Sequence, residues 1–244
     1  MCGRYTRFAA TELIYKHFGI PVPAPESPTA DAQPSWNVAP HSWQPVIRLN
    51  IVTGQREMAI MRWGLVPFWS KEPTHAWSTI NARAEDILTK PAFREPVRKR
   101  RCIVPIDSYF EWQVEDPNSK KKQPWAIGLK SGEPFALAGI WDHWENDPPT
   151  IVLETYAIVT CVPNTLLRPL HDRMPVILHP DEYDRWLEPG DPKNPPVDLL
   201  KPYPDELMKA WRVKNDVGNP RNNRPDLIDP FDPPADPGDK PSLF

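Results

Sequence analysis

The amino-acid sequence predicts one α+β domain with a curved, barrel-like, mostly antiparallel sheet and helices at its edges. Segments with strand character follow one another through much of the chain, while helical periodicity is confined to short stretches. The 244 residues include 34 prolines, and this much proline disfavours a helical bundle. Neither a repeat nor an internal linker divides the sequence. We therefore expect a single domain over residues 2–230 and a Pro/Asp-rich tail over 231–244.

The N-terminal part is predicted to hold a helix and a hairpin. Leu13, Ile14 and Phe18 fall on one helical face, and Gly19 is a typical helix stop. Thr53-Gly54 separates two strand-like runs and predicts a hairpin turn. The predicted elements are an extended piece at 3–6, a helix at 11–18, a loop at 21–34, strands at 45–52 and 57–63, an ordered loop at 64–80, and a helix at 84–98 interrupted at Pro91.

The C-terminal part is predicted to consist mostly of strands. Pro180 suits the first turn of a helix, and two acidic residues follow it there. The predicted elements are strands at 102–106, 109–112, 124–129, 135–144, 151–160 and 174–178, and helices at 163–170 and 180–187. The chain after Asp226 is rich in Pro and Asp and is predicted to be disordered.

The net charge of −3 argues at first against a nucleic-acid partner. The charge is uneven, however, because the segment Asp226–Phe244 carries five Asp and one Lys and so contributes −4, which leaves residues 1–225 at +1. Within that body, Arg94 and the run Arg98–Arg101 form a basic cluster. Such a cluster either binds a phosphate backbone or is simply a solvated face.

The composition also bears on metals, membranes and assembly. Three cysteines without CxxC spacing argue against a disulfide scaffold and a cysteine zinc site, and the histidines show no metal-like spacing. We expect neither metal nor cofactor. No long apolar run predicts a membrane span or a secretory signal. The expectation is a soluble intracellular protein, in the cytoplasm and nucleoid or in a nucleus, and a monomer, since nothing suggests a dimer seam.

Cys2 is a candidate nucleophile because it follows Met1. An initiator methionine is usually trimmed before a small residue, and trimming here leaves an α-amine and a thiol on one residue. Their reference pKa values of about 7.7–8.0 and about 8.5 give both groups a nucleophilic fraction near neutral pH. The amine attacks an aldehyde to give a Schiff base, and the thiol then closes a five-membered thiazolidine ring.

Two further residues are candidates for acid–base chemistry. Glu111 lies between aromatic residues, either facing solvent on an alternating strand or buried with a raised pKa that lets it exchange a proton near neutrality. His171 precedes a strand-like run and is flanked by charged residues. It is either an acid–base group or a histidine with a structural role.

Polar and aromatic residues between 68 and 83 are candidates for nucleic-acid contacts. Asn81 either caps a helix or hydrogen-bonds a sugar or a backbone group, and Arg83 suits a phosphate. Phe68 and Trp69 either stack on bases, which contributes about 1–3 kcal/mol per base, or pack against the protein.

Together, these residues stand in motifs that resemble one family, the SOS-response-associated peptidase (SRAP) family. The match runs in order over roughly residues 2–230. Its motifs are Met1–Tyr5, Trp36–Pro40, Met61–Pro67, Ile80–Glu85, Cys102–Pro105, Phe110–Trp112, His171–Val176 and Asn219–Asn222. Ser108 departs mildly, since the family often has Gly there.

The resemblance implies a sensor of abasic sites in single-stranded DNA, folded as one α+β domain with a positively charged groove. Cys2, freed of Met1, would form a thiazolidine crosslink with the sugar aldehyde, and self-removal of Met1 would use the same cysteine. Glu111 would deprotonate the Cys2 amine, His171 would act as acid and base in ring opening and in reversal of the crosslink, and Asn81 would hold Cys2 or the sugar. The implied DNA contacts are Arg4, Asn37, Pro40, Phe68, Trp69, Arg83 and Arg173.

Two other functions remain open on the sequence alone. One is an N-terminal-nucleophile hydrolase in which Cys2 attacks amides or peptides. The other is a non-catalytic module that binds modified DNA, for which Cys2 would be dispensable.

Overall fold

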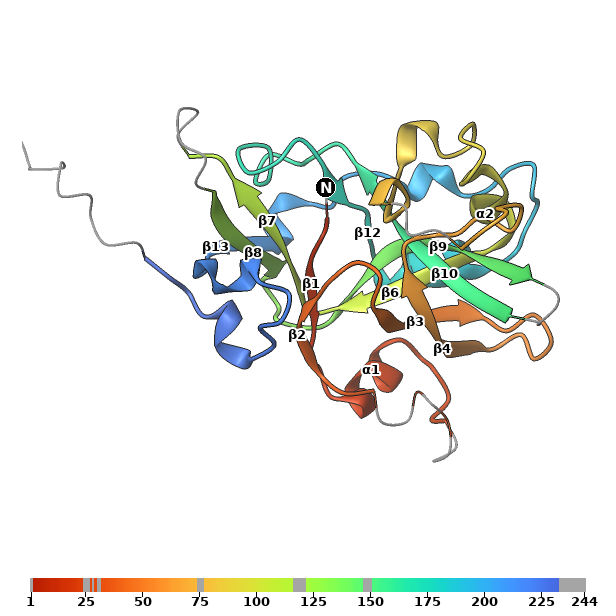
Figure 1. Ribbon diagram of the computed structural model, residues 1–244, viewed down its shortest axis with the longest axis horizontal. Coiled ribbons are helices and arrows are strands. Elements are labelled where there is room, and N and C mark those ends of the chain that lie inside the picture. Colours follow the sequence, from red (N-terminus) through yellow and green to blue (C-terminus); the bar gives the residue numbers. More distant parts are fainter. Residues whose placement is uncertain are drawn as a thin grey trace, which may run out of the picture.

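The computed structural model (Figure 1) describes residues 2–23, 27, 29, 32–73, 77–115, 122–146 and 151–232, which form two sheets and short peripheral helices. Of the predicted tail at 231–244, only the first two residues fall within these ranges.

The larger sheet closes into a five-stranded ring. Its strands are β3 (Trp43–Leu49), β4 (Arg56–Trp63), β6 (Arg101–Ile106), β9 (Phe135–Asn146) and β10 (Ile151–Cys161). They pair in the order β4-β3-β6-β9-β10, and β10 returns to β4. All of these pairs are antiparallel except β10 with β4. The predicted α+β fold with a barrel-like, mostly antiparallel sheet is confirmed.

The second sheet lies beside this barrel, on the left in Figure 1. Its order is β13 (Met208–Arg212), β8 (Gln123–Leu129), β7 (Ser108–Gln113), β1 (Tyr5–Arg7) and β2 (Ser35–Val38). Only Asp107 separates β7 from the barrel strand β6, so the two sheets are joined where the chain passes between them. This arrangement brings the N-terminal strand between β7 and β2.

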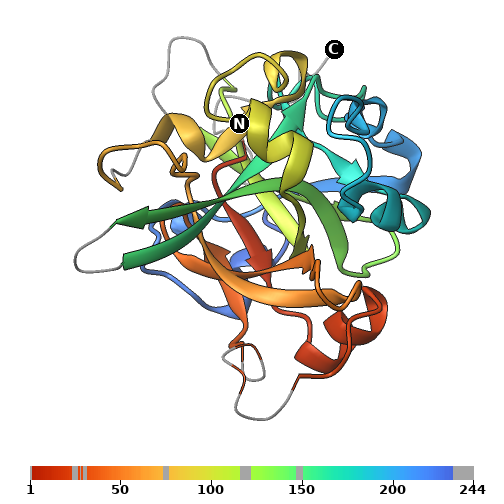
Figure 2. The same ribbon diagram turned by 90° about the vertical axis from the view of Figure 1, so that its right-hand side faces the viewer.

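Short helices lie around the two sheets, and three short strands extend the larger sheet by pairing with β9 or β10 (Figure 2). They are α1 (Thr11–His17), α2 (Arg94–Lys99), α3 (Tyr183–Leu187), β5 (Asn81–Arg83), β11 (Met174–Pro175), β12 (Ile177–Leu178), η1 (Trp77–Thr79), η2 (Ala84–Asp86), η3 (Pro180–Glu182), η4 (Val197–Leu199), η5 (Asp205–Leu207), η6 (Asn215–Gly218) and η7 (Pro225–Ile228). Among the described residues, no helix has both the length and the apolar character needed to cross a membrane.

Several local predictions were wrong. The segment 163–170 forms turns rather than a helix, because the Asn164 side chain accepts the Leu167 N–H at 3.1 Å and Pro169 has no N–H to donate. The predicted helix at 84–98 reduces to η2 and α2. The prediction of disorder after Asp226 was also wrong for the first residues of that segment, because η7 buries Leu227 in a small core cluster.

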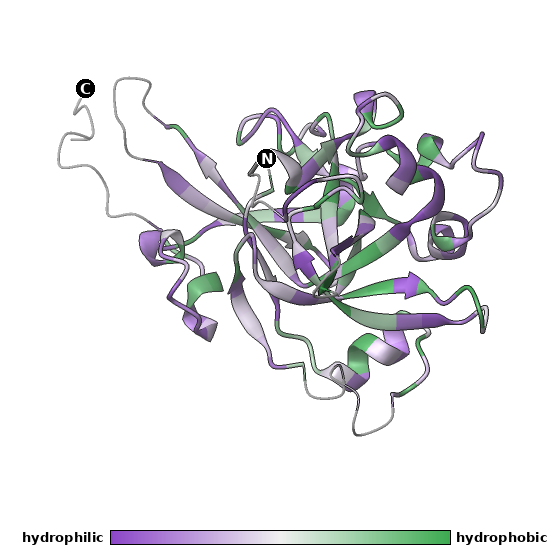
Figure 3. Cartoon of the chain, turned by 45° about the vertical axis from the view of Figure 1, so that its right-hand side comes forward, coloured by the Kyte–Doolittle hydropathy of each residue, from purple (hydrophilic) through white to green (hydrophobic). Residues whose placement is uncertain are grey.

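The main core fills the barrel, and apolar stretches follow its strands while polar ones follow the periphery (Figure 3). Tyr5 from β1, Trp63 from β4 and Tyr156 from β10 are fully buried there. The rings of Trp63 and Tyr156 stack with centroids 6.3 Å apart, and the hydroxyls of Tyr5 and Tyr156 lie 2.8 Å apart. These contacts fix the start of β1, and therefore the position of Cys2, against the barrel wall.

Candidate active site

Cys2 lies three residues before the start of β1 and is fully buried. Its carbonyl oxygen accepts a hydrogen bond of 2.9 Å from Asn81 Nδ2. Asn81 opens β5, which pairs in parallel with β10 opposite Ile158. The alternative that Asn81 caps a helix is wrong, because Arg83 holds the N-cap position of η2. The amide of Asn81 therefore ties the N-terminal residue to the barrel.

Glu111 and His171 form the second part of the site. Glu111 lies on β7 and is only 5% exposed, so of its two possible environments the buried one is present. Burial raises the pKa of the Glu111 carboxyl to about 7. His171 Nε2 lies 3.9 Å from Glu111 Oε2. A carboxyl with this pKa exchanges a proton near neutral pH, which is the property required of a general base.

The imidazole of His171 is oriented by its own neighbours. Its Nδ1 accepts the Arg173 backbone N–H at 2.9 Å and lies 2.8 Å from Asp172 Oδ1, while its Nε2 faces Glu111. Burial lowers the pKa of His171, while the nearby Asp172 carboxylate acts in the opposite direction. The lowered pKa favours the neutral ring, whose Nε2 faces the site.

The Cys2 thiol is held in its neutral form. Burial raises its pKa far above the ordinary value, and the charge of Glu111 adds to that effect. The register of β1 against β7 also brings the chain next to Cys2 alongside Glu111, since Tyr5 lies opposite Tyr109 and the Phe110 N–H donates to Arg4 O at 2.9 Å. Cys2, Cys102 and Cys161 are all buried and free. Within the described residues, no three His, Cys, Asp or Glu side chains converge as a metal ion would require.

Tyr109 belongs to the same site, and sequence reasoning did not single it out. It lies two residues before Glu111 on β7, so both side chains point to the same face of the strand. Tyr109 is fully buried, and its hydroxyl has no hydrogen-bond partner among the described residues. Burial raises its pKa well above the ordinary value, and the charges of Glu111 and Cys2 contribute. Strand alternation around Glu111 was the signal that could have identified it.

Tyr109→Phe is expected to leave the free energy of unfolding unchanged or to raise it by about 1 kcal/mol, because the variant removes a buried polar group that makes no bond. Urea denaturation measures this effect. Tyr5→Phe is the matched control, since the Tyr5 hydroxyl bonds to Tyr156 at 2.8 Å and its loss should destabilise the protein. Equal destabilisation by both substitutions would contradict the prediction.

Phe68 and Trp69 are exposed by 53% and 56%, so neither serves mainly as internal packing. They lie in the segment between β4 and η1, which is closed at its base by a bond from Leu65 N to Thr79 O of 3.1 Å. The chain continues from this base through Ile80 into Asn81. The base of the aromatic segment therefore leads into the residue that holds Cys2.

Arg83 and Pro40 are two further residues that were predicted to contact DNA. Arg83 is exposed at the end of β5. Pro40 is half-buried, and the next residue, His41, donates its N–H to Trp63 O at 2.8 Å, at the start of the aromatic segment. Both positions remain candidates for contact with a ligand.

The remaining predicted contacts are engaged within the protein. Asn37 is buried and donates through Nδ2 to Asn219 O at 3.0 Å and to Asn222 O at 2.8 Å. Arg4 Nη1 donates to Asn37 Oδ1 at 2.8 Å. Arg173 forms a two-bond ion pair with Glu85, at 2.7 and 2.8 Å. We therefore assign Asn37 and Arg4 to anchoring the C-terminal segment, and Arg173 to fixing the backbone next to His171.

Within the basic cluster, Arg101 is also internal. It is buried and donates to the carbonyl oxygens of Val97, Trp186 and Glu188. The remaining cationic residues of the cluster stay at or near the surface on and around α2.

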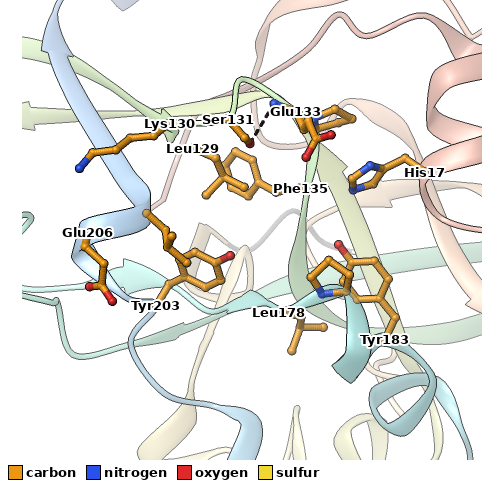
Figure 4. A pocket seen from close by; sticks show the side chains of 13 residues that line it. His17, Leu129, Lys130, Ser131, Glu133, Phe135, Leu178, Tyr183, Tyr203 and Glu206 are labelled. Carbon is orange, nitrogen blue, oxygen red and sulfur yellow. Dashed lines mark hydrogen bonds between the residues drawn. The ribbon is translucent and has the colours of Figure 1, made fainter.

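A separate pocket of about 340 Å³ lies elsewhere in the molecule (Figure 4). Aromatic rings of Phe135, Tyr183 and Tyr203 line it, with the carboxylates of Glu133 and Glu206. None of its lining residues belongs to the predicted site. It lacks the combination of a nucleophile and a base with a shifted pKa that surrounds Cys2.

The chain is similar to known proteins over nearly its whole length. The family model "SOS response associated peptidase (SRAP)" matches residues 1–220. A Bacillus subtilis protein named abasic site processing protein YoqW is 41% identical over 94% of this chain and 99% of its own length. The abasic site processing protein HMCES of Pongo abelii is 34% identical, over 82% of this chain and 66% of that protein.

A solved structure shares the fold. The crystal structure of a Bacteroides thetaiotaomicron protein matches with a TM-score of 0.82 and 31% identity, covering 94% of this chain and all of the other. The extent of the sequence match and the agreement of the fold lead to one conclusion: the chain belongs to the SRAP family.

Proposed function

We propose that this protein processes abasic sites in single-stranded DNA by capturing them covalently through Cys2. The relatives at 30–41% identity carry the name abasic site processing protein. The observation that carries the proposal is the burial of Glu111 on β7, alongside the chain that leads from Cys2 into β1, where burial raises the pKa of its carboxyl to about 7.

The reaction requires an aldehyde, which an abasic deoxyribose presents when its ring opens. After Met1 is removed, the Cys2 amine adds to the aldehyde carbon, and loss of one water gives the Schiff base. The thiol then adds to the same carbon, and its proton is transferred to the nitrogen. The product is a thiazolidine with a C–N and a C–S bond to the sugar, and water is the only leaving group.

The site residues divide this work. Glu111 takes a proton from the Cys2 ammonium, whose reference pKa is about 7.7–8.0, so donor and acceptor are closely matched. His171, whose Nε2 faces Glu111, supplies a proton for opening the sugar ring, and the same two groups serve reversal of the crosslink. Asn81 holds the Cys2 carbonyl, and its Oδ1, which has no partner among the described residues, accepts from the amine or the sugar.

The surface around the site supports a single strand as the partner. Exposed aromatic side chains such as Phe68 and Trp69 stack on unpaired bases, whose faces a duplex would cover. We assign Arg83 and Pro40 to the same contact surface, where the exposed guanidinium of Arg83 suits a phosphate. The interaction with phosphates gives binding that weakens as the salt concentration rises.

Met1 removal precedes capture, because the Cys2 nitrogen is part of a peptide bond while Met1 is attached. We propose that the Cys2 thiol and Glu111 perform this cleavage, which accounts for the peptidase in the family description. A general amidase, which would need Cys2 to be a thiolate before the substrate binds, is less well supported, because burial keeps the Cys2 thiol protonated.

The test is to mix purified protein, with Met1 removal verified by mass spectrometry, with single-stranded DNA containing one abasic site. On a denaturing gel, the wild-type protein should give a slow band that is absent for Cys2→Ala and for the same DNA without the lesion. No band from the processed wild-type protein would contradict the proposal. Tight binding by Cys2→Ala without any adduct from the wild-type would favour the non-catalytic module.

A further inference from the structure

Side chains of β9 anchor the backbone at both ends of the exposed aromatic pair Phe68–Trp69 through two hydrogen bonds. On one side, the Phe68 backbone N–H donates to Asp142 Oδ2 at 3.1 Å. On the other, Trp144 Nε1 donates to Ser70 O at 2.8 Å. A turn bond from Ser70 N to Pro67 O, 2.9 Å long, closes the segment between the two anchors. In Figure 2 this orange-to-yellow segment runs along the outer part of the β9–β10 hairpin.

Asp142 is an unusual anchor because its side chain is almost fully buried, at 1% exposure. Burial raises the pKa of its carboxyl, and the Arg100 guanidinium acts in the opposite direction. Arg100 Nη2 lies 3.0 Å from Asp142 Oδ1, and the His143 N–H donates to the same oxygen at 2.8 Å. Burying a carboxylate is costly unless donors satisfy it. The Asp142 carboxylate is satisfied by the backbone N–H groups of Phe68 and His143 and by the Arg100 guanidinium. One of its donors, Phe68, therefore belongs to the aromatic segment.

We propose that Asp142 is a positioning residue for nucleic-acid binding: it holds the Phe68–Trp69 turn as a rigid platform on which bases of a single strand stack. Through Arg100, the same carboxylate joins the platform to the basic surface around α2. The inference rests on the proposed function, because it names how the partner strand is engaged beside the Cys2 site.

The physical basis is preorganisation. An aromatic side chain on an unanchored loop loses conformational freedom when a base stacks on it, and this loss weakens binding. With the backbone fixed on both sides of Phe68–Trp69, that ordering has already taken place during folding. Removing the Asp142 anchor should therefore weaken DNA binding while leaving the covalent step at Cys2 unchanged.

The test compares Asp142→Asn with Asp198→Asn. Both remove one negative charge and keep the side-chain size, but Asp198 is a surface residue paired only with Arg185 among the described residues. An oligothymidylate without a lesion reports non-covalent affinity, and the abasic strand at saturating concentration reports the crosslinking rate. We expect Asp142→Asn to raise Kd about three- to tenfold, with a crosslinking rate within about twofold of wild-type. Asp198→Asn should change neither quantity.

Two readouts separate positioning from general stability. Hydrogen exchange should show protection lost at the Phe68 amide in Asp142→Asn, with the amides of β3 and β6 unchanged. In a double-mutant cycle, Asp142→Asn should cause little further loss of affinity once Phe68 and Trp69 are both alanine. If Asp142→Asn does not fold, Trp144→Phe removes the other anchor and should give the same pattern.

The outcomes are distinct. Failure of wild-type protein to bind the oligothymidylate would refute the proposed function itself. Wild-type binding with unchanged affinity in Asp142→Asn, or with fully additive losses in the cycle, would refute only the positioning role. Reduced affinity that disappears in the Phe68/Trp69 double-alanine background would support it.

Discussion

Glu111→Gln is expected to slow crosslink formation by about 10²- to 10⁴-fold, the range typical of a general base, and at the same time to make the folded protein more stable at alkaline pH. The two effects have one cause. The carboxyl is buried next to Cys2, where its charged form is poorly solvated, and this unfavourable environment is also what raises its pKa to about 7. Glutamine keeps the shape of the side chain but neither ionises nor accepts the proton.

The sign of the stability effect follows from the pKa. The ordinary value of 4.5 applies to the unfolded chain, and the value in the folded protein is about 7. Below pH 4.5 both states are protonated and the group has no effect on stability. As the pH rises from 4.5 to 7 the unfolded state ionises first, so stability falls. Above pH 7 the full cost of about 3 kcal/mol is present.

Urea denaturation at pH 4 and pH 8.5 measures this difference. Glu111→Gln should be more stable than wild-type at pH 8.5 by up to about 3 kcal/mol and nearly equal at pH 4. Glu115→Gln is the matched control, because Glu115 lies just beyond the same strand but is exposed and paired with Arg212. If the free energy of unfolding rises equally in Glu115→Gln, or rises equally at pH 4 in Glu111→Gln, the stabilisation does not come from removing the buried charge of Glu111.

The rate of crosslinking gives the catalytic half of the same prediction. In wild-type protein the base form of Glu111 accumulates through pH 7, so the rate should rise with pH across that region and then level off. In Glu111→Gln this rise should be absent, leaving only the titration of the amine. An unaltered pH profile in the variant would exclude Glu111 as the base.

Cys2→Ser is expected to form no adduct that survives denaturation, although it retains the α-amine. The amine can still form a Schiff base with the aldehyde, but that bond is hydrolysed because no thiol is present to close the thiazolidine. Borohydride added during the reaction should reduce the Schiff base and restore a stable band. The measurement is a denaturing gel with and without the reductant.

The controls for this variant follow from its chemistry. Serine has no thiol to perform the cleavage of Met1 proposed above, so Met1 is removed from this variant with a methionine aminopeptidase, and mass spectrometry verifies the free α-amine. Cys2→Ala should behave as Cys2→Ser does, since both keep only the amine. A stable band from Cys2→Ser without reductant would show that the thiol is not needed. Absence of a band even with reductant would show that the amine does not reach the aldehyde.

The barrel strands could be predicted because each carries its own signal. β3 and β4 flank a turn at Gly54, and β9 and β10 are long runs of apolar and β-branched residues. β2, β5 and β13 were missed. β5 has only three residues, and its partner β10 lies far along the chain, so no local pattern marks it. Such strands form because a neighbouring edge offers hydrogen bonds, which is a property of the assembled sheet.

The candidate site also has features that local sequence predicts and features that depend on distant segments. Cys2, Asn81, Glu111 and His171 were predicted from motifs, but local patterns could not decide whether Glu111 faces solvent or whether Asn81 caps a helix. Burial of β7 and pairing of β5 with β10 decide those questions. Asn37 shows the converse, since a residue expected at the DNA surface bonds instead to carbonyls near Asn219, more than 180 residues away.

The sequence by itself therefore determined the fold class and the barrel strands, and it singled out Cys2 as the candidate nucleophile, because these depend on residue type and on short-range periodicity. Only the tertiary structure decided the protonation state of Glu111, the hydrogen bond from Asn81 to Cys2 and the anchoring of Phe68–Trp69 by Asp142. Each of these depends on which groups are brought within a few ångströms of one another and shielded from water. Segments distant in the chain create that environment, and no local stretch of sequence specifies it.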